Sequence, residues 1–190
     1  MIKAPNINDP GRKRVPVEIR EMGIDDLPPV FHLGEKVFTA EQWPNLYRSW
    51  DEYEVVELFL GDSEFCLVAE TGERIIGFAL GTTISKARSP WKYGHLVWLG
   101  VDPGYQRYGV GEKLFKAMTD TMIENGVRIL TVDTQMDNLP ALDFFRKLGF
   151  SNPEEQVYLY LNLDKHKRRR VKRGARTPQV SPGARRKPKA

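Results

Sequence analysis

Two glycines, Gly109 and Gly111, follow Gln106 and Arg107 immediately before an expected amphipathic helix. Glycine costs about 0.5–1 kcal/mol in a helix relative to alanine, so the pair needs a structural reason. The first N–H groups of a helix lack intrahelical partners, and the helix dipole adds partial positive charge there. Missing side chains would expose these amides to a phosphate, and Arg107 would add a full positive charge. The spacing therefore predicts an anion site, with a plain structural turn as the alternative.

Two other phosphate-binding loops fit this stretch less well. The interval from Gly104 to Gly109 is that of a P-loop, but Val110 and Gly111 occupy the places of the required Lys and Ser or Thr. A dinucleotide-binding fingerprint would need a third glycine at position 114, where the chain has Leu114. The glycine spacing alone therefore does not identify the ligand.

The charge of the chain is divided unevenly along its 190 residues. Of the 29 Lys and Arg residues, 12 lie in residues 165–190, which contain no Asp or Glu. The other 17 accompany all 25 acidic residues, so residues 1–164 carry a formal charge of −8. A segment so rich in like charge, Pro and Gly is not expected to fold alone. We expect a flexible arm at 1–14, one domain at 15–164 and a disordered basic tail at 165–190.

The composition argues against several classes of protein. No apolar run approaches the roughly 18–20 residues that span a bilayer, and the N-terminus lacks the apolar region of a secretory signal. Cys66 is the only cysteine, which excludes an internal disulfide and a cysteine cage for a metal. The three histidines are scattered, which disfavours a zinc site. We therefore expect a cytoplasmic protein without a metal or a membrane span.

Hydrophobic periodicity predicts strands alternating with helices. Strands are expected near 15–22, 64–70, 74–84, 94–101, 128–135 and 156–163. Helices are expected after Asp25, after a capping box of Ser49 and Glu52, from Val110 to Asn125-Gly126, and from Asn138 to Gly149. The third helix places Val110, Leu114, Met118 and Met122 on one apolar face. The order β-α-α-β-β-β-α-β-α-β predicts a mixed α/β sheet with helices on its faces.

Two segments, LGVDPGYQRYGVGEKLF and DNLPALDFFRKLGF, together resemble the GNAT superfamily of acetyl-CoA-dependent N-acetyltransferases. The first matches the pyrophosphate-loop motif of the superfamily with Gln106, Gly109 and Gly111. The second matches its Asn-x-x-Ala-x-x-Phe-Tyr-x-Lys-x-Gly-Phe motif with Asn138, Ala141, Phe144, Phe145, Lys147, Gly149 and Phe150. The resemblance spans about residues 16–163 and is closest to enzymes that acetylate ribosomal-protein or other protein N-termini. It implies an α/β (α+β) fold: a mixed, mostly antiparallel sheet with helices on both faces and a splayed parallel strand pair that holds the cofactor.

The resemblance also implies how acetyl-CoA would bind. The pyrophosphate would contact the amides of residues 107–112, and the pantetheine arm would pair with the backbone of Leu99 and Val101. Asn138 and the last helix would flank the thioester. The implied cofactor-binding residues are Leu99, Gly100, Val101, Gln106, Arg107, Tyr108, Gly109, Val110, Gly111, Glu112, Asn138, Phe144 and Phe145.

Acetyl transfer to an amine requires a neutral amine, a stabilised oxyanion and usually a proton for the departing thiolate. By resemblance, His95 and Asp133 are the candidates to flank the amine, one as base and the other as its orienting partner. Asp133 is expected in a strand centre, where aspartate is depleted. Each has a structural alternative: a hydrogen-bonded core histidine, and an aspartate that ties down a loop or cap. Phe145 stands where many relatives have a tyrosine thought to protonate the sulfur, so another donor, water or an unassisted thiolate must serve.

The acceptor is less well defined by the sequence. The resemblance places it beside the loop between the first two helices, where Glu41, Trp43, Tyr47 and Trp50 would contact it unless the aromatic residues only close the core. The acidic domain favours a cationic amine or basic peptide, so a protein N-terminus or lysine is the leading expectation. The alternatives are a small amine, such as a polyamine or aminoglycoside, and an acetyl-CoA-sensing factor that contacts nucleic acid or the ribosome through the tail. The sequence leaves the acyl-chain preference and the oligomeric state open.

Overall fold

The computed structural model describes residues 16–39, 49–85, 90–151, 153–155, 157, 159 and 161. By its internal contacts the chain divides into two units, Met1–Asn152 and Pro153–Ala190, and all helices and strands below belong to the first. The arms expected at 1–14 and 165–190 lie outside the described residues. The domain limits at 15 and 164 therefore stay predictions.

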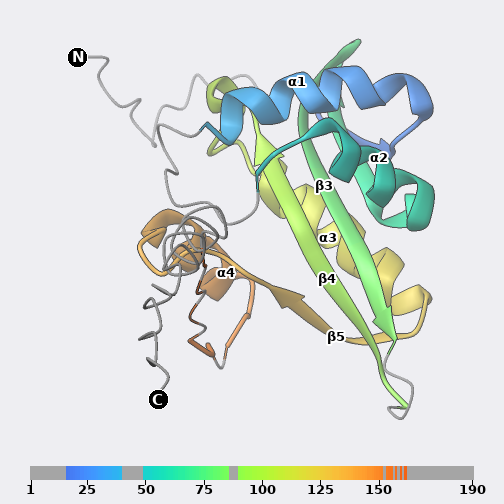
Figure 1. Cartoon of the computed structure of the whole chain (residues 1–190). Helices are drawn as coiled ribbons and strands as arrows, with labels where there is room; N and C mark the ends of the chain where they lie inside the picture. The colour runs from blue at the N-terminus through green and yellow to red at the C-terminus, as the bar shows by residue number, and fades with distance from the viewer. Residues whose placement is uncertain are drawn as a thin grey trace, which may run out of the picture. The chain divides into compact units, whose positions relative to one another are not determined.

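Among the described residues, five strands form one sheet in chain order (Figure 1). They are β1 (Glu18–Glu21), β2 (Cys66–Thr71), β3 (Arg74–Ser85), β4 (Lys92–Val101) and β5 (Val127–Val132). The first four strands pair antiparallel with their neighbours, whereas β5 runs parallel to β4. A parallel neighbour requires a crossover connection, which the helix between β4 and β5 supplies. The mixed, mostly antiparallel sheet that the sequence predicts is confirmed.

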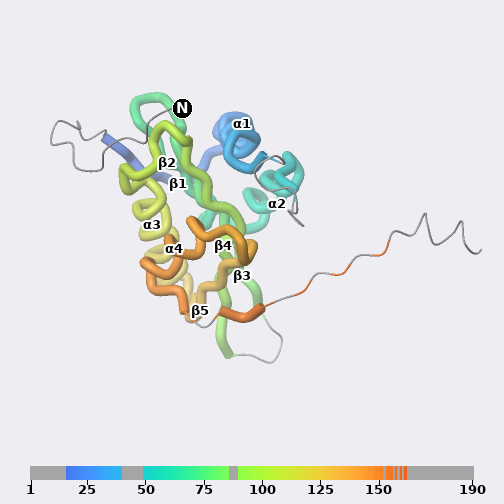
Figure 2. The backbone as a smooth tube through the Cα atoms, turned by 90° about the vertical axis from the view of Figure 1, so that its left-hand side faces the viewer, coloured from blue at the N-terminus to red at the C-terminus, as the bar shows by residue number. Residues whose placement is uncertain are grey.

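Four helices in the described part of the chain cover the sheet: α1 (Leu27–Val37), α2 (Glu52–Gly61), α3 (Val110–Glu124) and α4 (Leu139–Lys147). Figure 2 shows α1 and α2 on one side of the sheet and α3 and α4 on the other. α1 has proline in its first turn. The N–H groups of that turn have no acceptor within the helix, so the missing N–H of proline costs no hydrogen bond. α3 ends before Gly126, whose φ of +79° is a left-handed conformation that favours glycine.

The sheet separates two apolar clusters. One packs against α3, where Val110, Leu114, Met118 and Met122 are buried. Their interval of four residues returns to the same side of a helix, so the expected apolar face is confirmed. The other cluster packs against α1 and α2 and is built around the fully buried ring of Phe78.

The N-terminal cap of α2 differs from the expected capping box at Ser49 and Glu52. Asp51 precedes the helix, and its Oδ1 accepts a hydrogen bond from the Glu54 amide at 2.9 Å. A carboxylate at this place also meets the positive end of the helix dipole. Aspartate therefore caps the helix where the sequence predicts serine.

The strand expected at 156–163 is not formed at the three of its residues that the structure describes. Val157, Leu159 and Leu161 lie outside any strand and are 84%, 92% and 67% exposed. The other five residues of that segment lie outside the described part of the chain. Alternating apolar residues favour a strand only when a neighbour accepts their backbone hydrogen bonds.

Cys66 is fully buried in the core. Burial raises the pKa of its thiol to about 12. Because the thiolate is the reactive form, Cys66 is a packing residue and no nucleophile at neutral pH.

The described residues contain no group of three or more His, Cys, Asp or Glu side chains that could hold a metal ion. No helix in the described ranges is long and apolar enough to cross a membrane.

Asp26 and Arg20 form a partly buried ion pair that ties β1 to the start of α1. Arg20 Nη1 lies 2.5 Å from Asp26 Oδ2, which also accepts a hydrogen bond from the Gly23 amide at 2.7 Å. The hydrogen bond from Arg20 lowers the pKa of Asp26. A carboxyl group whose pKa is lowered by folding stabilises the fold above its unfolded pKa, and this stabilisation is lost as pH falls through the folded pKa.

We expect Asp26→Asn to lower the free energy of unfolding at pH 7 by roughly 1.5–3 kcal/mol, the range for hydrogen bonds to charged groups. The deficit should narrow as pH falls below about 3.9, because this carboxyl group is then protonated in the unfolded parent chain and the stabilisation is lost toward the lower pKa of the folded state. Urea denaturation at pH 7 and pH 3 measures both effects. As the control, Asp120→Asn removes an exposed carboxylate that pairs with Lys116 and should cost at most about 1 kcal/mol. An equal deficit for Asp26→Asn at both pH values would contradict the assignment.

Candidate active site

β4 and β5 are paired over only the first part of β4. The last pair is Leu96 with Val132, where β5 ends, whereas β4 continues to Val101. Figure 1 shows β4 and β5 diverging toward their arrowheads. The last part of β4 therefore has no β5 partner, and its backbone can pair with an extended ligand in the manner of an added strand.

The turn between β4 and α3 holds two residues in the left-handed backbone region. Arg107 has a φ of +66° and Gly109 a φ of +76°. This conformation is uncommon for residues other than glycine, and such strain concentrates at ligand-binding loops. The glycine at 109 is therefore required by the backbone conformation of the turn.

α3 opens directly from this turn. Its first helical bond joins the Lys113 amide to the Gly109 carbonyl at 3.0 Å. The amides of Val110, Gly111 and Glu112 precede that bond and have no intrahelical acceptor. These amides and the helix dipole lie where the sequence predicts an anion site, and the binding of an anion there stays a prediction.

Gly111 has a packing reason of its own. A Cβ at this position would lie 3.3 Å from Cζ of Phe144 and 3.8 Å from a methyl group of Val101. The missing side chain thus lets α4 pack closely against the start of α3. The sequence by itself suggested the approach of a ligand or a plain turn as the reason for this glycine, and did not suggest helix packing.

The other predicted cofactor residues near this turn are divided between the core and the surface. Leu99, Val101 and Tyr108 pack against the α3-side cluster. Gly100 is buried, and a Cβ there would meet the Phe78 ring at 2.7 Å. Gln106 is exposed, and its Nε2 donates to the Val101 carbonyl at 3.4 Å. Gln106 therefore braces the end of β4, at a carbonyl that an extended ligand would approach.

α4 supplies the last of the predicted cofactor residues. Asn138 caps this helix: its Oδ1 accepts a hydrogen bond from the Ala141 amide at 3.3 Å, and its Nδ2 donates to Thr134 at 3.1 Å. The Phe145 ring makes edge contacts with the rings of Phe144 and Phe150. Both residues therefore have structural roles, and their contact with the cofactor stays a prediction.

His95 and Asp133 lie side by side. His95 Nε2 is 3.0 Å from Asp133 Oδ1, and the two side chains are 16% and 36% exposed. The parallel register explains the contact, because Thr131 is the Cα partner of His95 and Asp133 follows two residues later on the same side. Asp133 lies one residue beyond the end of β5, so its expected place in a strand centre is wrong.

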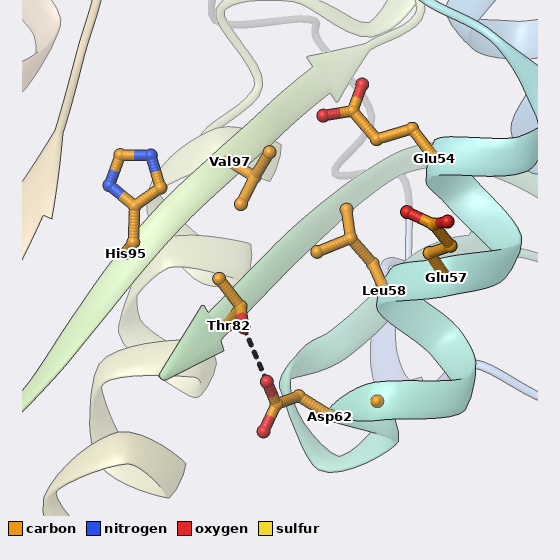
Figure 3. A pocket seen from close by; sticks show the side chains of 8 residues that line it. Glu54, Glu57, Leu58, Asp62, Thr82, His95 and Val97 are labelled. Carbon is orange, nitrogen blue, oxygen red and sulfur yellow. Dashed lines mark hydrogen bonds between the residues drawn. The ribbon is translucent and has the colours of Figure 1, made fainter. Parts of the chain in front are cut away.

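His95 faces an open pocket of about 300 Å³ between α2 and the strands β3 and β4. Figure 3 shows its ring across the pocket from Glu54 and Glu57, with Asp62 and Thr82 at the base. The full lining is Glu54, Glu57, Leu58, Gly61, Asp62, Thr82, His95 and Val97. Every charged group other than His95 in this lining is acidic, so the pocket favours a cationic ligand.

Two features of this pocket have no signal in the sequence. The pairing of β3 with β4 shifts between Leu80 and Gly81, which leaves Val97 without a Cα partner on β3. Such a bulge re-aims side chains next to active sites, and here both His95 and Val97 line the pocket. The Asp62 carboxylate accepts hydrogen bonds from Thr82 and Thr83 and so holds the end of α2 against β3.

The predicted acceptor residues Glu41, Trp43 and Tyr47 lie outside the described residues. Trp50 is described, and it closes the core: its Nε1 donates to the Phe31 carbonyl at 3.0 Å. Its ring also lies 5.2 Å, centroid to centroid, from that of Trp98. For Trp50 the structural alternative is therefore correct.

Comparison with known proteins gives one matching family model and several relatives. The model of the acetyltransferase (GNAT) family matches residues 36–150. N-alpha-acetyltransferase 30 of Homo sapiens is 28% identical over 99 residues, which cover 52% of this chain and 27% of that protein. [Ribosomal protein bS18]-alanine N-acetyltransferase of Escherichia coli is 25% identical over 151 residues, which cover 77% of this chain and 88% of that protein.

A solved structure, the NatC complex bound to Gag peptide and CoA, superposes with a TM-score of 0.63 at 19% identity. The match covers 76% of this chain and 91% of that one. At this identity the likeness concerns the fold alone. The chain spans only about a quarter of the human relative named above.

Proposed function

The chain belongs to the acetyltransferase (GNAT) family, and from this premise we propose that it acetylates the α-amine of a protein N-terminus with acetyl-CoA. The observation that carries the proposal is the His95–Asp133 pair, whose His95 lines an acidic pocket close to where the pairing of β4 with β5 ends. Relatives that are N-alpha-acetyltransferases or act on a ribosomal protein support the choice of acceptor.

The turn and the free end of β4 fit acetyl-CoA. The amides of Val110, Gly111 and Glu112 would hold the diphosphate, with Arg107 as the counter-charge. The unpaired end of β4 would pair with the amides of the pantetheine arm. When bound, acetyl-CoA would supply the acetyl group, activated as a thioester, for transfer to the acceptor amine.

The pair would remove the proton that prevents attack. A protein α-amine has a pKa of about 7.7–8.0, whereas a lysine at about 10.4 must lose its proton against roughly 4.6 kcal/mol at pH 7. Because an α-amine loses its proton more easily than a lysine does, it needs less help from a general base, which favours an α-amine as the acceptor.

In the transfer itself, the amine nitrogen bonds to the acetyl carbon and the carbon–sulfur bond breaks. The ammonium would pass one proton to the pair before the attack, and the nitrogen would release a second proton to water as the amide forms. The β4 amides beyond Leu96 would donate to the oxyanion. Phe145 cannot donate a proton to the departing sulfur. A thiol has a pKa of about 8.5, so coenzyme A can leave as the thiolate without a proton donor. The acidic lining from Glu54, Glu57 and Asp62 would attract the ammonium of the acceptor.

A panel of acceptors tests the proposal. Peptides with free N-termini, the same peptides with blocked N-termini and an internal lysine, and aminoglycosides or polyamines are each incubated with acetyl-CoA, and thiol release is measured. We expect release with the free N-termini, with mass spectrometry placing the acetyl group on the α-amine. Modification of only lysines or only small amines would reject the acceptor. No release with any amine, despite binding of acetyl-CoA, would favour the sensing role; contacts of residues 165–190 with nucleic acid or the ribosome stay a prediction.

A further inference from the structure

We propose that Thr131 is a positioning residue, which fixes the neutral His95 ring with its proton on Nδ1. The proposal rests on the proposed function of the His95–Asp133 pair. Its chemical consequence is that Nε2, the nitrogen that faces Asp133, becomes the basic atom of the ring.

The geometry places Thr131 between the two strands. Thr131 is the Cα partner of His95 in the β4–β5 ladder. Its Oγ1 lies 3.1 Å from the Gly94 carbonyl oxygen and 3.0 Å from His95 Nδ1. Both distances are those of ordinary hydrogen bonds, so one hydroxyl serves two neighbours.

The number of protons determines the direction of both bonds. A carbonyl oxygen can only accept, so the single hydroxyl proton of Thr131 goes to Gly94. The hydroxyl oxygen can then only accept from His95, which requires a proton on Nδ1. If the ring proton were on Nε2 instead, the lone pair of Nδ1 would face a lone pair of the Thr131 oxygen, and no hydrogen bond would form.

The same counting of protons applies to the contact between His95 and Asp133. With Nδ1 protonated, the contact of 3.0 Å between Nε2 and Oδ1 is a hydrogen bond only if it contains one further proton. The pair can take up that proton from the ammonium of the acceptor and hold it either as imidazolium and carboxylate or as neutral imidazole and carboxylic acid. When the proton leaves, the lone pair appears on Nε2, at the pocket side of the ring.

The charged groups near the His95 ring differ from Thr131 in which ring atoms they contact. Glu54 and Glu57 on α2, Asp62 just after it, and Asp133 after β5 are all acidic. The charges of Glu54, Glu57 and Asp62 do not choose between the two nitrogens, whereas Asp133 contacts Nε2. Thr131 contacts Nδ1, so the selection of Nδ1 as the protonated nitrogen depends on its hydroxyl.

Thr131→Val removes the hydroxyl and keeps the branched shape that suits a strand, and Thr131→Ser keeps the hydroxyl. Nitrogen NMR of ¹⁵N-histidine-labelled protein reports which ring nitrogen carries the proton, and His95→Ala identifies the signal among the three histidines. Above the pH at which the ring loses its charge, we expect the Nδ1–H form in the parent and the Ser variant. We expect the Nε2–H form in the Val variant, because Asp133 alone then attracts a ring proton.

Kinetics give a second readout. The Val variant should lose about tenfold in kcat, a small part of the roughly 10²–10⁴-fold available to a general base. Its KM for the acceptor should change less than twofold, the acidic limb of its pH–rate profile should move to lower pH, and Ser should restore kcat to within about twofold. An Nε2–H ring in the parent, or an unchanged ring form in the Val variant, would overturn the proposal. The NMR result needs no acceptor, so failure of acetyl transfer would reject the proposed function and leave the role of Thr131 decided separately.

Discussion

His95→Ala and Asp133→Ala should each lower kcat for acetyl transfer to an N-terminal peptide by roughly 10²–10³-fold, within the usual range for a positioned acid or base. Each variant removes one half of a contact of 3.0 Å, so the remaining partner no longer holds the amine proton in place. The affinity for acetyl-CoA, measured by calorimetry, should change less than twofold because the diphosphate turn is a separate part of the fold. Steady-state thiol release as a function of peptide concentration gives kcat and KM.

Matched substitutions elsewhere separate this effect from a general loss of structure. His32 is an exposed histidine on α1 that pairs with Glu35, so His32→Ala removes the same side chain far from the pocket. Asp120, on α3, is an exposed aspartate that pairs with Lys116. Both control variants should keep full turnover. Full turnover in both His95→Ala and Asp133→Ala would reject a catalytic role for the pair.

The double variant tests whether the two residues act together. If one orients the other, His95→Ala with Asp133→Ala should lose little more activity than the more damaging single change. Two residues that acted independently would instead multiply their effects. The loss of kcat should also depend on the acceptor. If the pair acts by removing a proton, its removal should lower kcat more for a lysine acceptor than for an α-amine.

Most of the elements were predictable because their signals are local. The apolar interval on α3, the cap at Asn138 and the left-handed Gly126 each depend on a few neighbouring residues, and all three occur as expected. The Asp51 cap was missed because several polar residues close together offer competing caps, and the helix backbone selects the one whose oxygen reaches an amide.

The site was less predictable because it depends on pairing between distant strands. The resemblance to the family indicated His95 and Asp133 as candidates, but their contact requires the parallel register of β4 and β5. The bulge at Val97 and the two bonds of Thr131 arise only from strand pairing, and neither residue type suggests them. The acidic pocket likewise needs α2 folded against β3.

The second large effect is expected at the turn before α3, where Gly109→Ala should raise the Kd for acetyl-CoA by one to two orders of magnitude. A Cβ at Gly109 would meet nothing within 4 Å, so the substitution causes no steric clash in the free protein. Its cost comes from the φ of +76°, at which a side chain adds about 1–2 kcal/mol of strain. A turn that relaxes this strain would misalign the amides of Val110 and Gly111, each worth about 1.5–3 kcal/mol to a charged acceptor.

Gly72 provides the matched control, because strain alone would also lower stability. It lies in the turn between β2 and β3 with a φ of +60°, and a Cβ there would likewise meet nothing within 4 Å. Gly72→Ala and Gly109→Ala should therefore lose similar amounts of unfolding free energy in urea, but only Gly109→Ala should lose affinity in calorimetry. Equal, parent-like affinity in both variants would place the diphosphate away from the first turn of α3. In that case the left-handed turn would serve the fold alone, and the free end of β4 would have to bind acetyl-CoA without it.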